Sequence, residues 1–451
     1  MAPLESLAQS TGTLFDIQSL RLSRLRSNLF LRRTGILSGG TALGQAFIVA
    51  ASPILSRVYT PRDFGRLALF TSFLNVVSVA VCLRYEVSIL SGKDDDESVY
   101  LTLASLLFAL PASILAGMIL WLLIHFSAVG FGDLASYTPP LFALAMCFVG
   151  IFSALRYWSL REERFLQLSQ GVVIQNAGRA IFQIIFGVAG FHSGGLLVGE
   201  TLGRSLGMSR MLRDAWPLLL SRLRSFCWRE FTQALRRHRK FPLYSLPSSF
   251  LDALCVSLPV ALLIRLYGSS VGGNYALVWA ALTVPATLVT TAVADTFHSH
   301  LTSCLREKPD CVMALFRRTT FGLLMMGSIP VLILWFWGLP LFKFVFGSQW
   351  ALSGEIAAVV GPWYLASFIV NPVSRVVFVL NGQEMKFLWD LLCLASLLIV
   401  FYVAKHEHTA PLDTIRILSV VNTVLYAVYY LLLIQIVARF QTTRKASAQY
   451  A

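Results

Sequence analysis

Charged residues are scarce in this chain. Asp, Glu, Lys and Arg make up only 13% of its 451 residues, whereas hydrophobic residues make up 56%. In a soluble domain about a quarter of the residues are charged. The composition therefore excludes an ordinary water-soluble fold. It agrees with apolar runs of ~20 residues, the length that crosses a bilayer, which recur from residue 35 to residue 438.

The chain also lacks the motifs that accompany catalytic or cofactor chemistry. No GxxxxGK[ST] phosphate-binding loop occurs, so ATP hydrolysis by this chain is not expected. The seven cysteines include no CxxC pair, and we expect them to pack inside the spans without a redox role. His406 and His408 flank Glu407 in a predicted exposed loop, which is more typical of a solvated turn than of a metal site. We expect no enzyme activity, no cofactor and no metal.

The apolar runs predict membrane-spanning helices. Strands of a membrane barrel would alternate polar and apolar residues, and these runs do not. We therefore expect an all-α polytopic membrane protein with about twelve spans. The predicted spans are 35–56, 67–91, 99–126, 138–158, 168–190, 193–212, 241–264, 270–297, 319–346, 355–381, 385–404 and 414–438.

The distribution of the 37 Lys and Arg residues predicts the orientation of the chain. Most of them fall on one side of the predicted membrane, in the tail 1–33, beside Arg161 and in the central loop 213–240. By the positive-inside rule this side is cytoplasmic, and an even number of spans places both termini there. The formal net charge of +14 then reflects topology, and no nucleic-acid partner is expected. The central loop is expected to contact anionic lipid headgroups.

A weak internal repeat divides the chain into two halves. Five residues recur at a constant offset (265 − 57 = 208), a length that also holds six apolar spans. They are Arg57, Tyr59, Gly65, Ala68 and Leu69, repeated as Arg265, Tyr267, Gly273, Ala276 and Leu277. We interpret the first copy as a tight turn, in which Pro61 fixes φ and Gly65 permits a positive φ. The predicted domains are a cytoplasmic basic tail (1–33), an N-terminal six-helix bundle (34–212), a cytoplasmic linker (213–240), a C-terminal six-helix bundle (241–438) and a cytoplasmic tail (439–451).

Residues 35–100 resemble a known family. They contain LSGGTALGQ at 37–45, SPILSRVYTPRDFG at 52–65, LRYE at 83–86 and DDDE at 94–97. These runs resemble the amino-terminal half of bacterial polysaccharide flippases, in the oligosaccharidyl-lipid branch of the multidrug/oligosaccharidyl-lipid/polysaccharide (MOP) exporter superfamily. The resemblance implies two six-helix bundles that face each other across a central cavity.

The resemblance also implies a substrate and a place in the cell. The substrate would be undecaprenyl-pyrophosphate-linked sugar units, moved from the inner to the outer leaflet of the bacterial inner membrane. The product would be a surface polysaccharide, such as lipopolysaccharide or exopolysaccharide. A polysaccharide polymerase and a chain-length regulator are the implied protein partners.

Ionisable residues inside the predicted spans are costly, and we expect them to face a cavity or a partner. Arg179 is the strongest candidate, because it lies midway along the fifth span with no acid within four residues. Its guanidinium offers a planar fork of donors that suits a pyrophosphate, and three amide side chains share its helical face. The expected cavity residues are Arg179, Arg204, Arg84, Arg375, Gln175, Asn176 and Gln183. The candidates for ion coupling are Asp252, Glu200, Glu86 and Asp295.

Structural roles compete with several of these assignments. Glu200 and Arg204 have the spacing of an intrahelical ion pair. Arg84, Arg375 and Asp295 lie close enough to the span ends for their charged groups to reach the headgroups. The repeated turn residues are expected to be structural, with the two arginines as interfacial anchors. These residues are Arg57, Tyr59, Gly65, Arg265, Tyr267 and Gly273.

Three functions stay open at this point. The first is a flippase for lipid-linked oligosaccharides that works by alternating access. The second is a multidrug or cation antiporter of the same superfamily, which would need an acidic cavity. The third is a membrane polysaccharide polymerase or ligase. Such an enzyme generally needs an extended extracytoplasmic loop, and the longest one predicted here is 127–137.

Overall fold

The computed structural model describes residues 35–36, 38–224, 226–307, 311–379 and 383–449, and all regular elements in these ranges are helices. The first long helix is Ser38–Val58. The longer elements after it are α2 (Pro61–Ser78), α4 (Asp95–His125), α5 (Thr138–Arg161), α6 (Phe165–Val188), α7 (His192–Ser205), α8 (Ser209–Arg224), α9 (Trp228–Arg237), α10 (Leu246–Tyr267), α11 (Ser269–Glu307), α12 (Cys311–Phe346), α13 (Ala351–Val373), α15 (Gln383–His406) and α16 (Pro411–Gln449). The short elements are α3 (Tyr85–Ser88), α14 (Val376–Val379), η1 (Ile89–Ser91), η2 (Ala128–Asp133), η3 (Phe241–Ser245) and η4 (Ser348–Trp350).

Ten helices in the described part of the chain are long and apolar enough to cross a membrane. They match ten of the twelve predicted spans and confirm the polytopic all-α class. The predicted second and sixth spans meet shorter helices. α2 ends at Ser78, and Leu83 and Arg84 then take positive φ values, so the predicted span 67–91 is not one continuous helix. α7 has only 14 residues, a length of about 21 Å.

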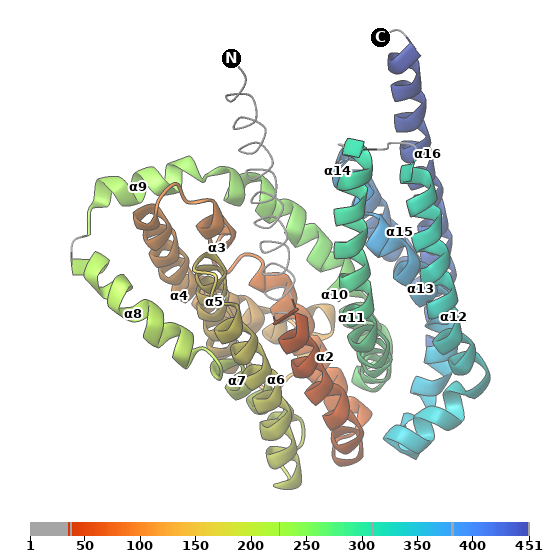
Figure 1. The fold of residues 1–451 in the computed structure, drawn as a ribbon. Coiled ribbons are helices and arrows are strands. Elements are labelled where there is room, and N and C mark those ends of the chain that lie inside the picture. The colour runs from red at the N-terminus through yellow and green to blue at the C-terminus, as the bar shows by residue number, and fades with distance from the viewer. Residues whose placement is uncertain (1–34, 37, 225, 308–310, 380–382, 450–451) are drawn as a thin grey trace.

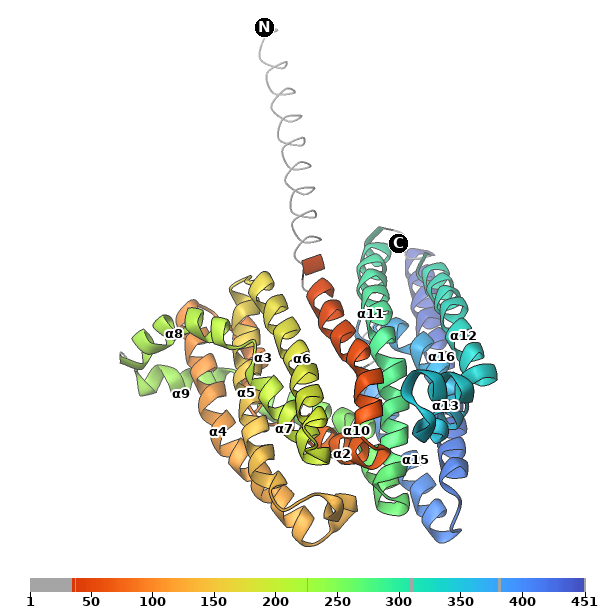
Figure 2. The ribbon, with the colours of Figure 1, turned by 90° about the horizontal axis from the view of Figure 1, so that it is seen from below.

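The long helices gather into two groups on either side of a middle region. Figure 1 shows α4–α9 on one side of the molecule and α12–α16 on the other, with α2, α10 and α11 in the middle. Figure 2 shows the same division from below. Although α2 belongs to the first half of the chain, it packs along α11 and α10 of the second half. The two halves therefore meet mainly through α2.

The first turn of α2 is stabilised by a helix cap. Thr60 caps the helix: its hydroxyl accepts from the backbone N–H of Asp63, whose carboxylate accepts from the N–H of Thr60. Pro61 occupies the first helical turn, where its missing N–H costs nothing. The prediction for Gly65 was wrong, because this residue lies inside α2 and the turn precedes it. In the second copy the turn is made by Gly268, whose φ is +86°.

Gly65 and Gly273 instead allow α2 and α11 to cross at backbone distance. A Cβ atom on Gly65 would lie 1.8 Å from the carbonyl oxygen of Ser269, and one on Gly273 would lie 1.9 Å from the carbonyl oxygen of Pro61. Neither position has room for a side chain. The repeated glycine is thus a helix-crossing residue in both copies.

The region predicted as a linker, 213–240, contains two amphipathic helices. The first of them, α8, begins at Ser209, before the predicted boundary. Both α8 and α9 pack on the helices of the first half, and Arg237 of α9 forms a 2.8 Å ion pair with the buried Glu97 of α4. At the other end, α16 runs continuously into the predicted tail 439–451.

Two of the seven cysteines are covalently joined. Cys304 and Cys311 form a disulfide between the end of α11 and the start of α12, with an S–S distance of 2.06 Å. The expectation that every cysteine only packs was therefore wrong for this pair. The other five cysteines are free thiols.

Candidate functional site

Arg179, Glu200 and Arg204 form a triad of charged groups between α6 and α7. The Nε of Arg179 lies 2.8 Å from Oε2 of Glu200, and Nη2 of Arg204 lies 2.7 Å from Oε1 of the same carboxylate. The two helices approach closely at Gly203, where a Cβ atom would lie 2.5 Å from the Cα of Arg179. The carboxylate therefore lies between two guanidinium groups.

Three amide side chains complete this network. Asn176 Oδ1 accepts a hydrogen bond from Nη1 of Arg179 (3.3 Å), and Gln183 Nε2 donates to Oε2 of Glu200 (3.3 Å). Gln175 Nε2 donates to the backbone carbonyl of Arg204 (3.0 Å). The amides predicted to share the face of Arg179 are thus brought together with it. Their hydrogen bonds fix the geometry of the charged groups.

The triad carries one excess positive charge, because it joins two guanidiniums to a single carboxylate. The exposed fraction of the side chain is 24% for Arg179, 16% for Arg204 and 1% for Glu200. The carboxylate of Glu200 is buried, whereas both arginine side chains keep part of their surface exposed. Such an arrangement can hold an anion through charge and through the N–H groups that the carboxylate does not use.

Arg179 has no acid within four residues in the sequence, but it pairs with an acid from another helix. This acid is Glu200, which lies 21 residues further along the chain in the neighbouring helix α7. The predicted intrahelical pair of Glu200 with Arg204 is present. The contact between Arg179 and Glu200 could have been predicted from Gly199 and Gly203 in α7, because glycines four residues apart are typical of a close contact between two helices.

Two other pairs of predicted site residues are in contact. Arg84 lies 3.8 Å from Glu86 and donates to the hydroxyl of Ser245 at 3.4 Å. Arg375 Nη1 lies 2.6 Å from Asp295 Oδ1. In each pair a predicted cavity residue contacts a predicted ion-coupling residue, so their charges cancel locally.

Asp252 belongs to a second group of charges, which the sequence reasoning missed. Lys386 Nζ lies 3.9 Å from Asp252 Oδ1 and also contacts Asp390, one helical turn away in α15. Two carboxylates and one ammonium leave one excess negative charge. The i, i+4 spacing of Lys386 and Asp390 at the start of the predicted eleventh span was the available signal.

The repeated turn residues lie where the two halves touch, at the end of the molecule where α16 begins. Tyr59 donates to the backbone carbonyl of Gln183 (2.8 Å), and Tyr267 lies 2.6 Å from the hydroxyl of Thr414. Each tyrosine therefore fastens the turn to its own half. Arg57 donates to the carbonyl of Phe344 at 3.4 Å, across the boundary between the halves.

Two sets of hydrogen bonds join the halves beside the glycine crossing, and we call them together the seam. In the first set, the backbone carbonyl of Ser56 accepts from Nε2 of Gln349 (2.6 Å) and from Nε1 of Trp350 (2.8 Å). In the second set, the carboxylate of Asp133 accepts from the hydroxyl of Ser269 across the boundary, and it also accepts from Arg62 of its own half (3.0 Å). The contacts are reciprocal, since the turn of each half meets a loop of the other.

The pKa of Asp133 reflects its place in the seam. Burial alone would raise the pKa of this carboxyl, but the hydrogen bonds from Ser269 and Arg62 and the charges of Arg62 and Arg66 outweigh it. The net effect is a pKa below the ordinary value of 3.8. Asp133 is therefore ionised at neutral pH in the closed seam.

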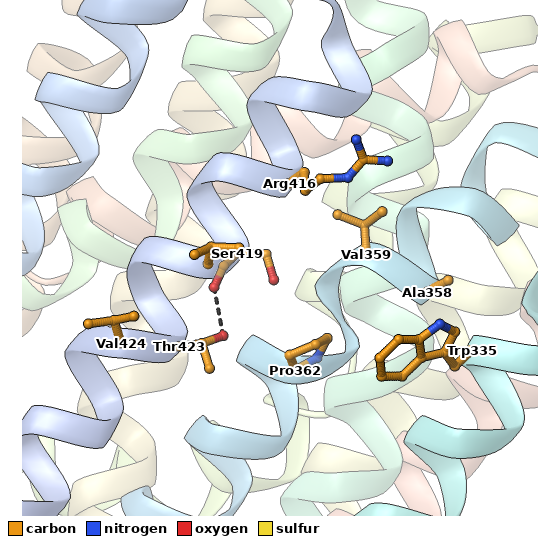
Figure 3. Close-up of a pocket in the computed structure, with 9 residues that line it drawn as sticks. Trp335, Ala358, Val359, Pro362, Arg416, Ser419, Thr423 and Val424 are labelled. Atoms are coloured by element: carbon orange, nitrogen blue, oxygen red, sulfur yellow. Dashed lines mark hydrogen bonds between the residues drawn. The ribbon is translucent and has the colours of Figure 1, made fainter.

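A groove of about 390 Å³ lies between α12, α13 and α16. Figure 3 shows Trp335, Pro362 and Val424 among its mostly apolar walls, with Arg416 at one side. Arg416 forms a 2.8 Å ion pair with Asp413, so this groove has an apolar wall and a neutralised charge. The predicted cavity and ion-coupling residues do not line it.

The overall fold is similar to those of solved MOP-type transporters. The lipid II flippase MurJ in an inward closed conformation aligns with a TM-score of 0.62 at 14% identity, over 90% of each chain. An inward-facing multidrug resistance MATE transporter of the MOP superfamily aligns at 0.53 and 12%, over 90% of this chain and 96% of that one. A MOP superfamily transporter from Pyrococcus furiosus aligns at 0.52 and 14%, over 91% and 96%.

Sequence comparison identifies the family. No curated protein gives a match. The family model described as polysaccharide biosynthesis protein matches residues 54–354 of the 451. This match and the MOP-type fold confirm the predicted resemblance to polysaccharide flippases. The chain therefore belongs to the family of polysaccharide biosynthesis proteins, and it is a multi-pass membrane protein whose fold is similar to that of MOP-type transporters.

Proposed function

We propose that the chain moves undecaprenyl-pyrophosphate-linked sugar units from the inner to the outer leaflet of the bacterial inner membrane. The proposal includes an orientation with both termini in the cytoplasm, which rests on the distribution of Lys and Arg. On this orientation the seam is extracytoplasmic. The substrate would supply repeat units for a surface polysaccharide.

The observation that carries the proposal is the excess positive charge of the triad. A pyrophosphate with attached sugars cannot cross ~30 Å of hydrocarbon without a replacement for its hydration. Arg179 and Arg204 offer planar donor groups, and the neighbouring amides offer further donors and acceptors. A guanidinium stays charged at every working pH, so the affinity for phosphate would not depend on protonation.

The transport cycle would use the seam as its outer gate. Rocking of the two halves would break the hydrogen bonds of Ser56 and Asp133 and separate the glycine crossing. These contacts are hydrogen bonds and close packing without a covalent link, so they can open and reform. The amphipathic helices α8 and α9 would rest on anionic headgroups of the cytoplasmic leaflet while the halves move.

Deletion of the gene tests the proposal. The deletion strain should accumulate lipid-linked repeat units on the cytoplasmic leaflet and lose a surface polysaccharide. Both defects should be restored by the wild-type gene. Normal surface polysaccharide in the deletion strain would contradict the proposed function.

A cation antiporter is the alternative that one observation favours. Asp252, Lys386 and Asp390 together carry one excess negative charge, which could attract a cation. This alternative predicts normal surface polysaccharide and raised sensitivity to cationic drugs in the same deletion strain. The two phenotypes separate the two functions.

A further inference from the structure

A groove of about 650 Å³ lies between the start of the helix Ser38–Val58 and the first turns of α6. Its walls are mostly apolar, and three of its large side chains, Leu43, Leu166 and Ile174, are at least half exposed. Exposed apolar side chains in a membrane-spanning helix are more stable against hydrocarbon than against water, so we expect the groove to open laterally toward lipid. Its position along α6 places it within the leaflet where α6 begins.

Glycines of the first helix shape this groove in two different ways. Gly40 and Gly44 press against α6, since a Cβ atom on them would lie 1.7 Å from Ser169 Oγ and 2.7 Å from Asn176 Nδ2. Gly39 points elsewhere: a Cβ atom there would meet nothing within 4 Å. The first two glycines hold the helices together, and Gly39 leaves the space of the groove unfilled.

The rim of the groove carries a positive charge. Gln170, one of the lining residues, accepts a hydrogen bond from Nη1 of Arg210 at 3.0 Å. An amide orients the guanidinium without neutralising it, and within the described chain no carboxylate lies within ion-pair distance of Arg210. The groove of Figure 3 differs in this respect, because Asp413 neutralises its arginine.

Amide side chains of α6 lead from this rim to the positive charge of the triad. Gln170 and Arg179 are nine residues apart in one helix, which corresponds to about 14 Å along the axis. Asn176 lies between them, contacts Gly44 of the first helix and accepts a hydrogen bond from Arg179. The groove and the triad therefore lie on the same helix, joined through Asn176.

We propose that this groove is the loading site for the hydrocarbon chain of the lipid substrate. A polyprenyl chain occupies the apolar walls, and its phosphate contacts Arg210 before it moves to Arg179 and Arg204. The inference rests on the proposed function for the orientation of the chain and for the polyprenyl nature of the lipid. It adds the place where the lipid first binds and the residue that selects its phosphate.

The test uses a photoactivatable polyprenyl phosphate in membrane vesicles that contain the full-length protein. The probe should label residues of the first helix or the start of α6, and unlabelled polyprenyl phosphate should compete. Gly39→Trp fills the groove and should lower labelling by about tenfold. Gly322→Trp is the matched control, because a Cβ on Gly322 in α12 also meets nothing within 4 Å, and its labelling should equal wild type.

Variants of the rim test the phosphate contact separately. Arg210→Ala should lower labelling by the phosphate probe several-fold while labelling by an uncharged polyprenol probe stays the same. Arg210→Lys should recover part of the loss, since a point charge still attracts phosphate. If Gly39→Trp fails to accumulate in the membrane, Gly39→Leu provides a smaller side chain for the same measurement.

Three outcomes overturn the inference. Labelling elsewhere in the chain, equal competition by phosphatidylglycerol, or unchanged labelling in Gly39→Trp would each do so. The second outcome would make the groove a general phospholipid site. The phenotype of the deletion strain does not depend on these labelling results. A wrong assignment of the groove can therefore be distinguished from a wrong proposed function.

Discussion

Gly65 and Gly273 hold equivalent places in the two copies of the repeat, and each one faces the backbone of the other copy. Gly65 meets Ser269 at the start of α11, and Gly273 meets Pro61 at the start of α2. The two residues therefore contribute to one crossing. On the proposed orientation, this crossing closes the extracytoplasmic side of the transporter.

Substitution of either glycine should open the seam. In Gly65→Ala or Gly273→Ala, the new methyl group would force α2 and α11 apart, and such overpacking typically costs about 1–3 kcal/mol. The balance between closed and open seam should shift by roughly 5- to 150-fold. A cysteine at Ser269, which is buried in the closed seam, should then react faster with a membrane-impermeant maleimide. Gly322→Ala serves as the control, and equal reactivity in all three variants would contradict the assignment.

A covalent bond across the seam should arrest transport. Asp133 and Ser269 are joined by a hydrogen bond between loops of different halves, so cysteines at these two positions should form a disulfide on oxidation. Complementation of a deletion strain should fail under oxidising conditions and return after reduction. The single variants Asp133→Cys and Ser269→Cys measure any loss that comes from the substitutions alone. Full transport with the disulfide in place would show that the seam does not need to open.

The seam should be insensitive to pH in the physiological range. The closed state lowers the pKa of Asp133 below its ordinary value of 3.8, so its stabilising contribution is complete above that value. The contribution is lost only as pH falls through the lowered pKa. Reactivity of a cysteine at Ser56, which is buried in the seam and leaves the Ser269–Asp133 hydrogen bond in place, should thus be the same from about pH 5 to pH 8, after correction for thiol ionisation. A change within this window would assign the pH response to another group.

Variants of the triad should distinguish residues that bind the substrate from residues that stabilise the fold. In Arg179→Ala, Glu200 keeps Arg204 and Gln183, so the protein should accumulate normally while transport is lost. Arg179→Lys should keep part of the activity. In Glu200→Gln, two guanidiniums lose their carboxylate, and loss of one member of a buried ion pair costs about 3–5 kcal/mol. This variant should have reduced membrane levels.

Complementation and membrane levels have to be measured together for these variants. Full complementation by Arg179→Ala would exclude a role in phosphate binding. Loss of Arg179→Ala from the membrane would make the residue structural. Either result would remove the observation on which the substrate assignment depends.

The proposed orientation is tested at the loop between the halves. A reporter fused after Trp228, at the start of α9, should be cytoplasmic. An external reporter at this position would reverse the sidedness of the seam and of the groove beside Gly39. The positive-inside rule is the physical basis of the expectation, since nine Lys and Arg residues lie between Arg210 and Lys240.

Composition and hydropathy predicted most of the fold, because a membrane helix has to be long and apolar whatever it packs against. They failed at α2 and α7, where contacts with neighbouring helices stabilise segments that are short or charged. The predicted span 67–91 shows this at α2: its apolar composition continues beyond Ser78, yet the helix ends there and Leu83 and Arg84 take positive φ values.

The candidate site was only partly predictable for a related reason. The sequence placed Arg179 and its amides on one helical face, because that relationship is local. It did not pair Arg179 with Glu200, nor Asp252 with Lys386, since these contacts join different helices. The glycine repeat was found from its spacing, but its role as a crossing depended on which helices face each other.

The reciprocal crossing has a genetic consequence. A larger residue at position 65 meets the backbone of Ser269, so no shortening of a side chain at position 273 can make room for it. A second mutation that restores function would have to move a backbone. Such suppressors should therefore arise in the turns at Thr60–Pro61 and Gly268–Ser269, and each half of the gene should carry suppressors of defects in the other.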